Sequence, residues 1–122
     1  MADRVTEAEV AAFVARCQVV VDEYSRKSFE NLEPPVLVFD FAEAKKYVRV
    51  VSRDRYKQDD GTVLVNDRSG SAWCFVNLET GDVLKPDGWK RPAPQPRGNI
   101  RDEHGGMATV GPYGPAYLKR RG

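Results

Sequence analysis

The uneven distribution of proline and glycine limits where this chain can form regular structure. Six of the eight prolines and seven of the ten glycines lie after residue 85. Proline lacks a backbone N–H and glycine costs conformational entropy, so this segment is unsuited to a continuous helix or a central strand. The 122-residue chain has the size of a single domain. We therefore expect a helix-plus-sheet core at residues 1–85 and an irregular arm at residues 86–122 that packs on the same domain.

The segment after the N-terminus has the pattern of an amphipathic helix. Thr6 followed three residues later by Glu9 is the signature of a capping box, which starts a helix. Apolar side chains then recur at spacings of three and four residues, at Val10, Phe13, Val14, Cys17, Val21 and Tyr24. This spacing predicts a helix from about Glu7 to Arg26 whose apolar stripe packs on the core.

Short apolar segments with turn residues between them predict an antiparallel sheet. Strands are expected at residues 36–41, 47–51, 62–65, 72–78 and 83–85, and the mixed-charge stretch 52–61 is expected to be a loop. The connections are too short for parallel crossovers, so neighbouring strands should be antiparallel. The predicted fold class is α+β, with the N-terminal helix packed on a sheet of four or five strands.

The hairpin strand at residues 72–78 has apolar side chains on both faces. Strict alternation places Ala72, Cys74, Val76 and Leu78 on one face, and Trp73 and Phe75 on the other. If the first set faces the helix, Trp73 and Phe75 lie on the far side. There they are either covered by a loop or form an exposed aromatic patch.

Catalytic and metal-binding chemistry finds little support in the sequence. Cys17 and Cys74 have no CxxC spacing and apolar neighbours, which predicts two buried, reduced thiols rather than a disulfide or a zinc site. The single histidine, His104, lies in a turn-like stretch, and no serine or cysteine has an evident partner base. The sequence favours a non-enzymatic binding protein without a metal or cofactor.

The charge of the chain is divided between two unlike parts. Residues 1–84 contain eleven basic and fifteen acidic residues, a balance of −4, whereas residues 85–122 contain eight and three, a balance of +5. A basic arm with an aromatic residue suits single-stranded nucleic acid, because phosphates pair with cations and unpaired bases stack on rings. The candidate binding residues are Lys85, Trp89, Lys90, Arg91, Arg97 and Arg101, with charge added by Lys119–Arg121 and stacking by Tyr113 and Trp73. Alternatively, Trp89 anchors the arm to the sheet and the basic residues are solvated.

Four segments of the chain resemble a pattern in small bacteriophage proteins of uncharacterised function. The segments are Lys46–Val51, Phe75–Lys85, Trp89–Ala93 (WKRPA) and Arg97–Ile100 (RGNI). From the first segment to the last, the likeness extends over roughly half of the chain, and it includes the hairpin and the start of the arm. The resemblance implies a phage origin and supplies no activity.

A second functional class is open beside nucleic-acid binding. A phage accessory protein, either a virion component or a factor against host defences, would bind a phage or host protein or itself. Its interaction surface would be formed by Trp73, Phe75 and Tyr113. The N-terminus lacks a signal-peptide pattern and the apolar runs are too short to cross a bilayer, so we expect a location in the cytoplasm of the host cell and no membrane partner.

Overall fold

The N-terminal capping box forms as the sequence predicts and starts the helix. The backbone N–H of Glu9 donates to Thr6 Oγ1 (3.2 Å), and the N–H of Thr6 donates to Glu9 Oε1 (3.2 Å). Helix α1 spans Glu7–Ser28 and has Arg26 and Lys27 in its last turn, where positive charge complements the helix dipole. The predicted helix over residues 7–26 is confirmed.

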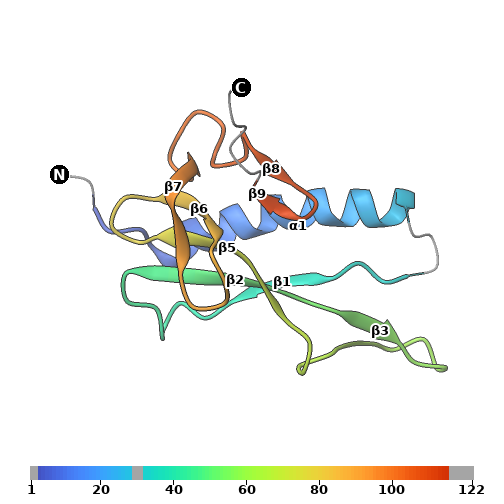
Figure 1. Cartoon of the computed structure of the whole chain (residues 1–122). Coiled ribbons are helices and arrows are strands. Elements are labelled where there is room, and N and C mark those ends of the chain that lie inside the picture. The colour runs from blue at the N-terminus through green and yellow to red at the C-terminus, as the bar shows by residue number, and fades with distance from the viewer. Residues whose placement is uncertain (1–2, 29–31, 116–122) are drawn as a thin grey trace.

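Helix α1 lies along one face of a five-stranded antiparallel sheet (Figure 1). The computed structural model describes residues 3–28 and 32–115. The sheet has the strand order β1-β2-β5-β6-β7, and two short hairpins, β3–β4 and β8–β9, lie outside it. The strands are β1 (Val36–Phe39), β2 (Tyr47–Arg53), β3 (Arg55–Lys57), β4 (Val63–Val65), β5 (Ser71–Asn77), β6 (Asp82–Pro86), β7 (Pro92–Asn99), β8 (Val110–Gly111) and β9 (Gly114–Pro115). The predicted fold class, a helix on an antiparallel sheet, is confirmed.

The hydrophobic core lies between α1 and the sheet face that it covers. The helix contributes its predicted stripe, with Phe13 and Cys17 fully buried, and the sheet contributes residues such as Val48 and Cys74. Both cysteines are free and buried. Burial raises the pKa of Cys17 to about 12 and that of Cys74 well above its ordinary value. Their thiolate forms are therefore scarce at neutral pH, which makes both sulfurs poor nucleophiles.

A β-bulge changes which face of β5 the Trp73 side chain occupies. The register between β2 and β5 shifts at Val50/Val51, where Cys74 is opposite Val50 but Ala72 is opposite Val51. Trp73 is the extra residue, and it packs in the core cluster together with its neighbour Cys74. The expectation that Trp73 lies on the far face with Phe75 is therefore wrong, because strict alternation fails at a bulge.

The β8–β9 hairpin covers Trp73 at close range. Gly114 has a φ of +107°, and a Cβ added there would lie 2.6 Å from the carbonyl oxygen of Trp73. Only glycine fits this backbone conformation and this approach. Trp73 is 5% exposed as a result, so it forms no aromatic surface patch.

Part of the expected irregular arm is a regular strand. Residues 92–99 form β7, which pairs with β6 and is the last strand of the sheet. Pro92, Pro94 and Pro96 are tolerated there because an edge strand has one side without sheet partners, so missing N–H groups break few bonds. The expectation of an irregular arm is therefore wrong for residues 92–99, and also for the short strands β8 and β9.

The stretch expected to be a mixed-charge loop at residues 52–61 also contains regular structure. Residues 52 and 53 extend β2, and Arg55–Lys57 forms β3, which pairs with β4. This small hairpin projects beyond the end of the five-stranded sheet (Figure 1). Its charged side chains conceal the strand in the sequence, because they leave no apolar alternation to detect.

Candidate nucleic-acid interface

The sheet face opposite α1 carries a groove of about 600 Å³ that we call the basic groove. Its basic lining residues are Lys45, Lys46, Arg49, Arg53 and Lys90. Its aromatic lining residues are Phe39, Tyr47, Phe75 and Trp89. Asp40 and Glu43 are the two acidic residues of the lining, so cations exceed anions by three. Excess positive charge beside aromatic rings is the combination that a single-stranded polyanion requires.

The alternating side chains of β2 create the floor of this groove. Val48 and Val50 face the helix and are fully buried, so the alternate residues Tyr47, Arg49 and Val51 face the other way. Each face of the strand thus has its own chemistry, apolar toward α1 and basic-aromatic toward the groove.

Arg49 is held by aromatic rings at the centre of the groove. Its guanidinium carbon lies 4.4 Å from the ring centroid of Trp89 and 5.9 Å from that of Phe75. Tyr47 packs edge-on against Phe75, with ring centroids 6.5 Å apart. The Nε of Arg49 is buried and has no hydrogen-bond partner among the described residues. The charge of Arg49 is therefore stabilised mainly by ring faces.

Trp89 reaches the groove from the connection between β6 and β7. The N–H of Asp87 donates to the carbonyl oxygen of Arg91 (2.9 Å), which closes a turn with Trp89 near its tip. Gly88 adopts a φ of +104° within this turn, a conformation that favours glycine. Trp89 packs against Arg49 and still leaves 43% of its surface exposed. The same ring thus anchors the turn and leaves part of its surface open to solvent.

The predicted nucleic-acid-binding residues do not form a single cluster. Trp89 and Lys90 line the basic groove, and Arg91 lies in the same turn, 3.6 Å from Asp87. Lys85 instead donates to the carbonyl oxygen of Pro115 (3.0 Å), on the side of the β8–β9 hairpin. Burial lowers the pKa of this lysine.

The remaining predicted residues lie outside the groove, with one exception. Arg97 is buried and donates to the carbonyl oxygen of Gln95. Tyr113 is 72% exposed and donates a hydrogen bond to the hydroxyl of Tyr24. Phe75 is 3% exposed and forms part of the groove floor rather than an exposed patch. The basic tip Lys119–Arg121 lies outside the described residues.

The sequence comparison assigns the chain to a family. Residues 2–111 match the model of a family of unknown function (DUF7717). The chain belongs to the DUF7717 family. The matched range contains α1, the five-stranded sheet and every residue of the basic groove. No curated protein and no solved structure matches the chain.

Within the part of this DUF7717 member that the structure describes, two further features bear on function. No helix among residues 3–28 and 32–115 has the length and apolar character needed to cross a bilayer. The same residues contain no group of three or more His, Cys, Asp or Glu side chains placed to hold a metal ion.

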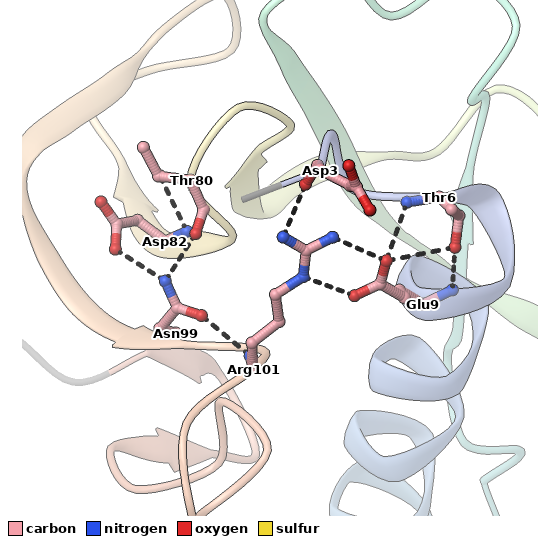
Figure 2. A network of polar contacts seen from close by, with 7 residues as sticks. All are labelled: Asp3, Thr6, Glu9, Thr80, Asp82, Asn99 and Arg101. Carbon is pink, nitrogen blue, oxygen red and sulfur yellow. Dashed lines mark hydrogen bonds and ion pairs between the residues drawn. The ribbon is translucent and has the colours of Figure 1, made fainter. Parts of the chain in front are cut away.

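Arg101 has a structural role that we call the Arg101 clasp (Figure 2). Its guanidinium pairs with Glu9 twice, Nε with Oε2 (2.7 Å) and Nη2 with Oε1 (2.8 Å), and Nη1 donates to the carbonyl oxygen of Asp3 (2.6 Å). Asn99 Oδ1 accepts from the N–H of Arg101 (2.8 Å), while its Nδ2 donates to the carbonyl oxygen of Thr80 (2.8 Å). The clasp joins the start of α1 to the sheet, which directs this arginine away from the groove.

The Arg101 clasp should make part of the protein's stability sensitive to acid. The hydrogen bonds from Arg101 hold the pKa of Glu9 at about 2, below its ordinary value of 4.5. A lowered carboxyl pKa contributes stability that is present above about pH 4.5 and lost as the pH falls toward 2. We expect the free energy of unfolding of the Arg101→Gln variant to fall less between pH 4.5 and pH 2 than that of the unmodified protein. Urea unfolding at several pH values measures this difference. The exposed pair of Arg91 and Asp87 supplies the control, since Arg91→Gln should leave the pH dependence unchanged.

Sequence reasoning missed most of the basic groove. Four of its basic residues come from the part of the chain with a net negative charge, namely Lys45, Lys46, Arg49 and Arg53. The charge balance therefore pointed to the other part of the chain. The available signal was the alternation in β2, which places Tyr47 and Arg49 opposite the buried valines. Tyr47 and Arg49 come close to Trp89 only because of the order of the strands in the sheet. The sequence pattern does not specify this order.

Proposed function

We propose that this protein binds single-stranded nucleic acid through the basic groove. The observation that carries the proposal is the arrangement at the centre of the groove, where Arg49 lies against Trp89 and Phe75. The exposed part of Trp89 suits an unstacked base, and the exposed lysines Lys45, Lys46 and Lys90 of the lining are available to pair with phosphates. Duplex nucleic acid keeps its bases stacked inside, so it lacks the partner for Trp89.

The proposal also concerns where the protein acts. The resemblance of four segments to small bacteriophage proteins supports a phage-encoded protein acting in the cytoplasm of the host cell. Binding to exposed single strands requires no catalysis, and we therefore propose a non-enzymatic role.

Fluorescence anisotropy with a labelled oligonucleotide tests this function. Binding is measured at two salt concentrations, for the single strand and for the duplex that it forms with its complement. We expect tighter binding of the single strand and weakening at high salt, because bound cations release counterions from the strand. Lys46→Gln should lower the magnitude of the salt slope by roughly 0.7 if Lys46 neutralises one phosphate. Lys57→Gln, on the β3–β4 hairpin, is the matched control and should leave the slope unchanged. Equal or tighter binding of the duplex would contradict the proposal.

A second candidate is an accessory protein that binds another protein. The β3–β4 hairpin favours it, since Tyr56, Val63 and Val65 are 48%, 42% and 39% exposed on a projecting element. Val63 and Val65 lie on one face of the hairpin and Tyr56 on the other, so each face has apolar surface that a partner could cover. If neither oligonucleotide binds at low salt and sedimentation velocity shows an oligomer, protein binding replaces nucleic-acid binding as the function.

A further inference from the structure

A second cavity, which we call the tyrosine pocket, lies on the helix side of the sheet. It has a volume of about 330 Å³ and lies between the second half of α1, the connection to β1, the start of β5 and the β8–β9 turn. The volume is at the lower end of the range for small-molecule sites, roughly 300 to 1,000 Å³. The basic groove is on the opposite face of the sheet, so the two sites are separate.

Three aromatic residues from distant parts of the chain form the walls of the tyrosine pocket. They are Tyr24 of α1, Trp73 of β5 and Tyr113 of the β8–β9 turn. The rings of Tyr24 and Tyr113 pack edge to face with centroids 5.4 Å apart, and their hydroxyl oxygens are 3.0 Å apart. Tyr113 is 72% exposed, yet its packing and hydrogen bond with Tyr24 fix its position. A solvent-facing ring held in place in this way is suited to contacting a ligand.

The charge of the tyrosine pocket is opposite to that of the groove. Glu33 and Asp54 are its charged lining residues, and no Lys, Arg or His is among the described residues that line it. Neither carboxylate pairs with a basic group in residues 3–28 or 32–115. The neighbouring Arg55 is already held, because it lies 3.6 Å from Asp22 and donates to the carbonyl oxygen of Pro34 (2.6 Å). The pocket is thus aromatic and acidic.

We propose that the tyrosine pocket binds a small organic ammonium ion, such as a quaternary or alkylated amine. Aromatic faces attract such cations through their quadrupoles, and they pack against the N-methyl groups, which have no N–H to donate to a carboxylate. The carboxylates of Glu33 and Asp54 in the lining add long-range attraction for a cation. A hydrated metal ion is a poorer fit, because rings supply three of the walls and Glu33 and Asp54 are the only carboxylates among the described lining residues.

Isothermal titration calorimetry of the unmodified protein with choline, and with its neutral isostere dimethylbutanol, tests this site. The two probes have the same shape and differ in charge. We expect saturable binding of choline in the millimolar range, and binding of the alcohol at least about tenfold weaker. Equal affinities would show an apolar pocket without cation recognition and would overturn the proposal, as would the absence of saturable choline binding.

The location of binding can be read from Trp73. The chain has two tryptophans, so a Trp89→Phe protein reports fluorescence from Trp73 alone. Choline should change this signal with the same dissociation constant that calorimetry gives. A full calorimetric signal without any change at Trp73 would place the site elsewhere.

Charge variants provide the matched comparison. Glu33→Gln and Asp54→Asn keep the shape of the pocket, and each should weaken choline binding about threefold to tenfold. Asp59→Asn removes a carboxylate on the β3–β4 turn and should have no effect. Equal effects of all three variants would indicate net charge alone and would contradict a specific site. Circular dichroism melts confirm that each variant is folded before binding is measured.

Discussion

Replacing Phe13 with alanine is expected to lower the free energy of unfolding by about 3–5 kcal/mol. Phe13 is fully buried where α1 meets the sheet, and Gly106 lies against its ring. A Cβ added to Gly106 would lie 2.9 Å from Phe13 Cε1, which shows how tightly the ring is enclosed. The surrounding backbone can collapse little into the space left by the ring, so the cavity term adds to the transfer free energy of the removed atoms.

Urea unfolding followed by circular dichroism measures this loss. The matched control is Val19→Ala on the same helix, because Val19 is 55% exposed. That substitution should change stability by no more than about 0.5 kcal/mol. Similar effects from the two substitutions would contradict the assignment of Phe13 to the core.

Replacing Trp89 with alanine is expected to weaken single-strand binding by about 1–3 kcal/mol, which is roughly a 5- to 150-fold rise in Kd. The ring is the exposed aromatic surface at the centre of the basic groove, and its removal also takes away the partner of Arg49. Duplex binding should change much less, because it depends on charge. Anisotropy titrations with both forms of the oligonucleotide measure the difference.

The control for Trp89 is an exposed aromatic residue outside the groove. Tyr56→Ala removes a side chain that is 48% exposed on the β3–β4 hairpin. It should leave single-strand affinity unchanged. If Tyr56→Ala and Trp89→Ala have the same effect, stacking in the groove is not the source of affinity.

Local sequence signals predicted the helix and most strands because each depends on a short stretch of chain. Thr6 and Glu9 specify the start of α1, and the apolar spacing that follows specifies its buried face. The hairpin of β5 and β6 has turn residues between two apolar segments, at Glu79–Asp82. Such features act over a few residues, so they can be recognised without the rest of the fold.

The misplaced features depend on contacts between distant segments. Trp73 faces the core because a bulge forms opposite Val51, and the β8–β9 hairpin then covers it. Arg101 was grouped with the binding residues by charge, whereas its position beside Glu9 brings together residues 92 positions apart. The groove was missed for the same reason, since Arg49 and Trp89 meet only when the β6–β7 turn crosses the open face of the sheet.

The prolines of β7 have a consequence for how copies of this protein can associate. An edge strand with free N–H and C=O groups is a template for strand addition and aggregation. Pro92, Pro94 and Pro96 remove three of these donors at one edge, and the strand at the other edge, β1, has only four residues. Continuous sheets between molecules are therefore disfavoured at both ends. A concentrated solution of the protein should resist fibril formation. Partners of the protein would then contact the open sheet face or the projecting hairpin rather than a sheet edge.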